Sequence, residues 1–82
     1  MTYSNFRNLS ENEQADCLWD KGLPVGKYDM GDTRFVLYQV DEFYVEVTYQ
    51  TDFMEMVTLK AFQISNIPEI YQAQVNISGI KH

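Results

Sequence analysis

The side chains able to do covalent chemistry are few in this sequence. Cys17 is the single cysteine, and His82, the last residue, is the single histidine. A nucleophilic cysteine needs a base beside it, and the carboxylate of Asp16 next to Cys17 does not favour the reactive thiolate. The same count is too small for a zinc site of thiolate and imidazole ligands. We therefore expect no Cys–His catalytic pair and no bound metal, and interpret Cys17 as a half-buried structural residue.

The glycines lie too far apart to hold a phosphate group. Phosphate-binding loops place several glycines within a few residues, so that backbone amides surround the anion. The four glycines here are separated: Gly22, Gly26, Gly31 and Gly79. Neither G-x-x-x-x-G-K nor G-x-G-x-x-G occurs, and we predict that the protein uses no cofactor.

Glu46 is the carboxylate whose surroundings could give it a chemical role. It lies between Val45 and Val47 in a stretch rich in β-formers. A carboxylate held among aromatic rings could act as a general acid or base. The simpler interpretation is a solvated strand residue, paired across a sheet with Lys60 or Lys27. Both interpretations depend on the strands that position Glu46.

The stretch Arg34–Gln50 predicts a β-hairpin that turns at Asp41 and Glu42. Val, Tyr and Phe dominate both arms, and these residues suit a pleated, half-buried surface. With two loop residues, facing positions have numbers that sum to 83; a one-residue slip would mix the two faces. Because Glu disfavours the positive φ of a type I′ turn, a longer loop over 40–43 is an alternative with the same register.

This register gives the hairpin two faces of different composition. The first is almost wholly apolar and is the predicted core face: Val36, Tyr38, Val40, Phe43, Val45 and Val47. The second adds a carboxylate to an apolar patch and is the predicted interaction surface: Phe35, Leu37, Tyr44 and Glu46. Either one helix packs on each face of the sheet, or this patch is exposed, in which case it is expected to bind a partner.

A helix is predicted over residues 11–21. Ser10 and Glu13 match the S-x-x-E capping box, in which each side chain accepts a hydrogen bond from the other residue's backbone N–H. Gly22 suits the position after the helix end. The inward stripe consists of three residues at helical spacing: Ala15, Leu18 and Trp19. We expect Trp19, the largest of them, to anchor this helix on the sheet.

Two further strands are predicted on either side of the hairpin. The first, over 23–28, contains Pro24, which cannot donate to a ladder, so this strand should lie at a sheet edge. A turn at Gly31 connects it to the hairpin. The last strand spans about 54–62, where the alternation of apolar residues is irregular. That irregularity predicts either a strand buried on both faces or a bulge near Glu55.

The two ends of the chain carry weaker patterns. Ser65 precedes Pro68 as a capping residue precedes a proline in the first turn of a helix, which predicts a short helix from Pro68 to Val75 or Asn76. The string AQVNI is also compatible with a strand. Two aromatic residues near the start could dock on the core: Tyr3 and Phe6.

Taken in order, these elements predict an α+β fold: an N-terminal helix, an antiparallel β-meander of three to four strands and a short C-terminal helix. The length of 82 residues supports one small domain over residues 1–82.

Two strings, LWDKG at 18–22 and LYQVDEFYVEV at 37–47, carry a family resemblance. They are similar to small uncharacterised bacterial proteins with an L-W-x-x-G helix end and an L-Y-Q-[LV]-D-x-F-[FY]-V-E-V hairpin. The PEIY string at 68–71 is similar to the short closing helix of those proteins. The resemblance spans about residues 9 to 75. It implies the same fold and supplies no catalytic residue.

Charge and hydropathy exclude several classes of partner. The net charge of −6 comes from 12 acids and 6 scattered bases. Binding to phosphate backbones needs a basic stripe, so we expect no nucleic-acid partner. No apolar run is long enough for a membrane span and no signal segment is recognisable. With one cysteine, which fits a reducing compartment, these observations predict a cytoplasmic protein without a membrane partner.

The sequence therefore predicts a small soluble protein–protein interaction or regulatory module that is not an enzyme, with a protein partner or a second copy in a homodimer. The alternative is a small enzyme or ligand-binding domain that uses Glu46 in an aromatic pocket. A third hypothesis is an acidic regulator that mimics nucleic acid, which would align its carboxylates on one surface.

Overall fold

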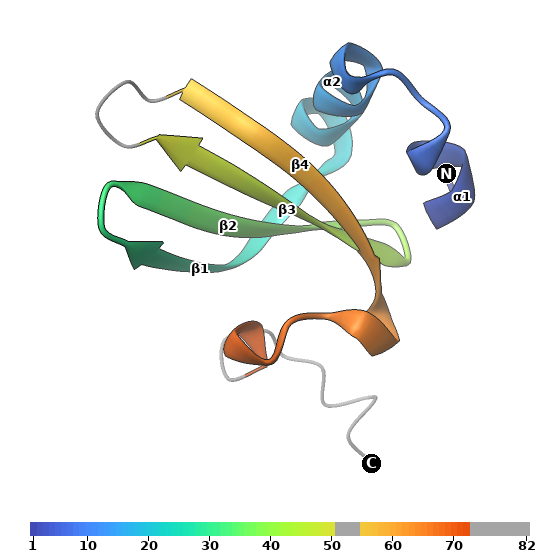
Figure 1. Cartoon of the computed structure of the whole chain (residues 1–82). Helices are drawn as coiled ribbons and strands as arrows, with labels where there is room; N and C mark the ends of the chain where they lie inside the picture. Colours follow the sequence, from blue (N-terminus) through green and yellow to red (C-terminus); the bar gives the residue numbers. More distant parts are fainter. Residues whose placement is uncertain (51–54, 73–82) are drawn as a thin grey trace.

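The computed structural model of the chain describes residues 1–50 and 55–72 (Figure 1). Two helices precede the sheet: α1 (Tyr3–Arg7) and α2 (Glu11–Lys21). Four strands follow: β1 (Leu23–Met30), β2 (Thr33–Val40), β3 (Phe43–Gln50) and β4 (Glu55–Gln63). Two 3-10 turns close the described chain: η1 (Ile64–Asn66) and η2 (Glu69–Tyr71). The strands form one antiparallel sheet in the order β1-β2-β3-β4, which confirms the predicted α+β fold.

The pairing of β2 with β3 has the predicted register over all its length. Val40 pairs with Phe43 and Arg34 with Tyr49, so facing numbers sum to 83 throughout. The loop is the two-residue one, and within the described residues Asp41 is the one non-glycine residue with positive φ, at 51°. Aspartate tolerates this conformation, so the strain expected for glutamate does not arise.

The predicted helix α2 has the predicted ends. Ser10 Oγ accepts a hydrogen bond from the Glu13 N–H at 3.2 Å, and Glu13 Oε1 accepts one from the Ser10 N–H at 2.9 Å. At the other end the Gly22 N–H donates to the Leu18 carbonyl at 2.7 Å. The capping box and the glycine therefore determine where the helix begins and ends.

A short helix that the sequence did not predict, α1, brings the N-terminal aromatics to the core. The Thr2 side chain caps it by accepting from the Asn5 N–H at 3.1 Å. Phe6 is fully buried, with its ring centroid 5.3 Å from that of Phe43, and Tyr3 meets the same ring edge-on at 6.3 Å. The expectation that both aromatics dock on the core is confirmed.

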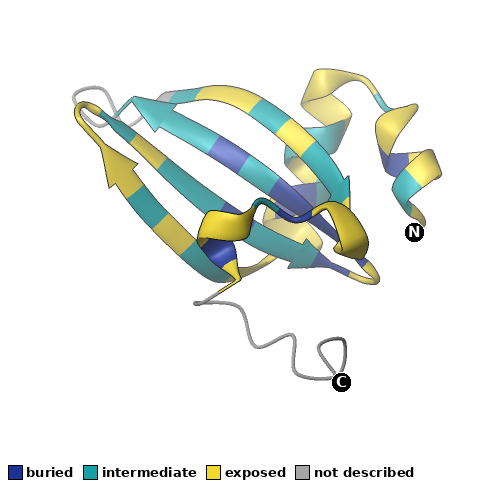
Figure 2. Ribbon diagram, turned by 60° about the horizontal axis from the view of Figure 1, so that its bottom comes forward, coloured by how far each residue is buried: buried dark blue, intermediate teal, exposed yellow. Residues whose placement is uncertain are grey.

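The first face of the sheet is covered by α1 and α2. The fully buried members of its core come from both helices and from β2 and β3: Phe6, Leu18, Val40, Phe43, Val45 and Val47. The opposite face is covered by the C-terminal turns. Figure 2 shows these turns in front of the sheet and the two helices behind it.

The expectation that Trp19 anchors α2 is wrong. Trp19 is 55% exposed, while its neighbour Leu18 is 1% exposed. Consecutive helical residues point about 100° apart, so only one of the two can point at the centre of the sheet. The indole instead lies at the margin of the core, edge-on to the Tyr38 ring at 6.1 Å.

Both edge strands are irregular. Pro24 lies in edge strand β1, as predicted. In β4, Thr58 pairs with Thr48 but Met56 pairs with Tyr49, which leaves Val57 as an extra residue. This bulge explains the irregular alternation, because it places Leu59 and Met56 against the same core. It lies two residues after Glu55, so the structure has the bulge, one of the two predicted alternatives. The predicted strand start at residue 54 is outside the described residues.

The C-terminal segment is less helical than expected within its described part. Its η2 turn begins at Glu69, and the predicted extension to Val75 or Asn76 lies outside the described residues. The prediction that Ser65 caps this helix is wrong, because Ser65 lies in η1 and neither turn has a side-chain cap. Pro68 disfavours helical φ/ψ at the residue before it, and Ile67 is accordingly extended, with ψ at 131°.

The contrast between Leu18 and Trp19 can be measured. We expect Leu18→Ala to lower the free energy of unfolding by about 2–4 kcal/mol, because it leaves a cavity in the core. Trp19→Ala should cost less than about 1.5 kcal/mol, since it removes mainly one edge contact. Urea unfolding followed by far-ultraviolet circular dichroism compares the two variants. Equal losses would contradict the placement of Trp19 at the margin.

Candidate functional site

The predicted interaction surface lies on the second face of the sheet, where the β2–β3 register positions it. Leu37 pairs with Glu46, Gln39 with Tyr44 and Phe35 with Thr48. Leu37 and Tyr44 are 0% and 4% exposed, while Phe35 and Glu46 are half-buried. All four predicted residues are thus close together on adjacent strands, and two of them are beneath other side chains.

The cover over this face is the chain's own C-terminal segment. Ile67 and Tyr71 are 5% and 0% exposed and pack with Leu37 and Tyr44 in one cluster. We call residues 64–72 the C-terminal cover. Of the two arrangements that the sequence left open, the described structure has a packed element on each face of the sheet.

A hydrogen bond between Tyr71 and Glu46 fixes the cover over the sheet. The Tyr71 hydroxyl donates to Glu46 Oε2 at 2.7 Å, and the two residues are 25 positions apart in the chain. Lys60 lies opposite Glu46 in the β3–β4 register, yet its ammonium lies over the Phe62 ring at 5.5 Å. Within the described residues no Glu46–Lys60 ion pair forms, so the phenol takes the place predicted for that lysine.

Aromatic rings form the side of this site. Tyr28 of β1 stacks on Phe35 with centroids 4.5 Å apart and planes 9° apart, and Tyr28 also meets the Tyr71 ring at 5.4 Å. Burial, together with the hydrogen bond and charge of Glu46, raises the pKa of Tyr71 far above its ordinary value. Burial and the same carboxylate raise the pKa of Tyr28. The Tyr71 phenol therefore keeps the proton that it donates to Glu46.

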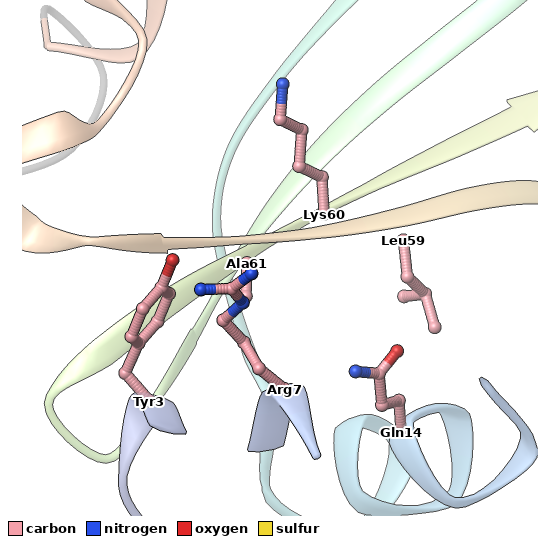
Figure 3. Close-up of a pocket in the computed structure, with 6 residues that line it drawn as sticks. All are labelled: Tyr3, Arg7, Gln14, Leu59, Lys60 and Ala61. Carbon is pink, nitrogen blue, oxygen red and sulfur yellow. The ribbon is translucent and has the colours of Figure 1, made fainter. Parts of the chain in front are cut away.

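A second concave surface lies on the other side of the sheet, between the helices and β4. Its cavity measures about 340 Å³ and is shown in Figure 3 with its lining residues: Tyr3, Arg7, Gln14, Leu59, Lys60 and Ala61. The Arg7 guanidinium lies over the Tyr3 ring at 5.5 Å, and Gln14 Nε2 donates to the Phe6 carbonyl at 2.9 Å. The Lys60 side chain points away from the cavity. Sequence reasoning missed this surface because it missed α1, whose signal was the Thr2 cap.

The Glu46 carboxylate accepts a hydrogen bond from the Tyr71 phenol. Glu46 is not among the residues that line the cavity beside Arg7. Within residues 1–50 and 55–72, no three His, Cys, Asp or Glu side chains are grouped so as to hold a metal ion. Cys17 is half-buried, with Sγ 3.5 Å from Met1 Sδ, while His82 lies outside the described residues.

No helix in the described part of the chain is long and apolar enough to cross a membrane. A scan of protein-family models, a search of curated proteins and a search of solved structures each found no match to this chain. The resemblance to small bacterial proteins therefore remains an expectation. The fold and the site together define a small compact α+β domain.

The Tyr71–Glu46 contact predicts a pH dependence. Because the pKa of Tyr71 is raised in the folded state, its contribution to stability is full below the ordinary phenol value of 10.0 and falls as pH rises above it. At its steepest, the free energy of unfolding falls by about 1.4 kcal/mol per pH unit for one phenol. Burial also raises the pKa of Tyr44 and Tyr49, so several phenols add to the alkaline loss.

We expect Tyr71→Phe to lower the free energy of unfolding by about 1–2 kcal/mol at neutral pH. The same substitution should reduce the loss of stability between pH 10 and pH 12, because one titrating phenol is removed. Chemical denaturation at both pH values measures each effect. Glu46→Gln is the matched control, because it removes the carboxylate but keeps a buried phenol that titrates. An alkaline slope unchanged by Tyr71→Phe would contradict the assignment.

Proposed function

We propose that this chain is a non-enzymatic protein-interaction module, whose second sheet face binds a short partner segment that takes the place of the C-terminal cover. One observation carries the proposal. The apolar floor of this face, Leu37 and Tyr44, is closed by a cover whose buried side chains within the described residues are Ile67 and Tyr71. A face whose cover buries two side chains within the described residues is easier to open than one closed by a capped helix.

The energetics of the cover support this proposal. Burying one large apolar side chain contributes about 1.5–3 kcal/mol, so Ile67 and Tyr71 together contribute about 3–6 kcal/mol. Ordering the segment opposes that gain. The cover is therefore expected to open locally at a lower cost than the sheet, and ligand-binding elements are drawn from such regions.

The contacts of the cover also indicate what a partner must present. Ile67 packs in the apolar cluster that contains Leu37, while Tyr71 donates its hydroxyl to Glu46 and places its ring against Tyr28. A partner segment needs an aliphatic residue and a tyrosine four positions later. Glu46 then acts as the acceptor that recognises the tyrosine hydroxyl, because a buried acceptor left without a donor is costly.

The alternative functions have less support. An enzyme that uses Glu46 needs space for a substrate beside the carboxylate, where Tyr71 lies instead. A nucleic-acid mimic needs free carboxylates on one surface, but Asp29 pairs with Arg34 at 2.8 Å and Asp41 with the N-terminal amine at 2.9 Å.

Peptide titration of the isotopically labelled full chain tests the proposal. The probe is a synthetic peptide of residues 64–72, ISNIPEIYQ, added to the wild type and to Tyr71→Phe. We expect the NMR signals of Leu37 and Tyr44 to shift, and to shift at lower peptide concentration in Tyr71→Phe, because its own cover competes less well. The control peptide carries serine at the positions of Ile67 and Tyr71. If neither protein responds to the native peptide, the face does not accept a segment in trans.

A further inference from the structure

We infer that the partner segment is supplied by a second copy of this chain, and that two copies exchange their C-terminal covers. The inference rests on the proposed function and names its partner. The segment that the structure shows on this face is the chain's own, so a second copy offers the same Ile67 and Tyr71 side chains. Exchange of an identical element is a low-cost route to a symmetric dimer, because each native contact is kept.

The connection between β4 and the cover has the features of a hinge. After Gln63 the chain passes through η1, where Ser65 and Asn66 are exposed. Ile67 and Pro68 are then extended, with ψ of 131° and 138°. Neither turn is held by a side-chain cap. The backbone of Ser65 and Asn66, whose side chains are exposed, therefore determines whether the cover folds back on its own sheet or continues outward from β4.

Two large apolar side chains of the C-terminal cover are exposed in the single chain. Ile64 is 39% exposed in η1 and Ile70 is 48% exposed in η2. Burial of either side chain against a second copy would favour association. The charge of −6 on each chain opposes association. Because salt screens this repulsion, the dimer fraction should rise with ionic strength.

Shortening the hinge tests the exchange directly. Deletion of Ser65 and Asn66 removes two of the three residues of η1, through which the chain passes from β4 back to its own sheet. The shorter connection strains this return and favours a cover that continues to a partner's sheet. Sedimentation equilibrium should show a monomer–dimer equilibrium for the wild type and a dimer dissociation constant at least about tenfold lower for the shortened chain. The matched control inserts two glycines after Asn66 and should raise the dissociation constant.

A mixed-label NMR experiment on the wild type shows whose cover closes each face. In a sample of half ¹³C-labelled and half unlabelled chains, isotope-filtered NOEs between the Tyr71 ring and the Leu37 methyls arise only if the cover comes from the other copy. We expect these NOEs at concentrations where the dimer is populated. Their absence in a populated dimer would overturn the exchange, whether or not the shortened chain folds.

The two proposals fail in different ways. If the wild type stays monomeric at high salt while the peptide shifts the NMR signals of Leu37, the partner is not a second copy. The proposal of an interaction module is then retained. If the peptide shifts no NMR signals, and the shortened chain is a monomer with Leu37 exposed, both proposals are overturned.

Discussion

The structure depends on the burial of β3 from both sides. Phe43, Val45 and Val47 point at the helices, while Tyr44 points at the opposite face, and all four are buried. A strand that is apolar on both faces must be covered twice. In a chain of 82 residues with a central four-stranded meander, the two ends supply those covers. The N-terminal helices close one face, and the C-terminal turns close the other.

The two covers are unequal in how much of the chain builds them. The first rests on an eleven-residue helix with a complete capping box and on α1. The second rests, within the described residues, on two buried side chains and one hydrogen bond to Glu46. Local stability follows the amount of apolar surface that each element buries. Within the described residues, the cover of the second face is therefore the one expected to open locally at the lower cost.

Much of the fold could be predicted because it follows from local patterns. The alternation in β2 and β3 determines which side chains must be buried, and this determines the register. Ser10, Glu13 and Gly22 mark the ends of α2 through contacts only three or four residues long. The four residues of the predicted interaction surface were found in the same way, since they share one face of the hairpin. Whether that face serves a partner remains a prediction.

What the sequence alone determined was the fold class, the hairpin register and the helix ends, because short-range sterics and a periodicity of two or 3.6 residues decide them. Tertiary structure decided which of two adjacent residues, Leu18 or Trp19, enters the core, because helical spacing admits both. It also placed the extra residue of β4 at Val57, which maintains the contact with β3. The Tyr71–Glu46 bond depends on how the chain returns across the sheet over 25 residues, and no local pattern encodes that path.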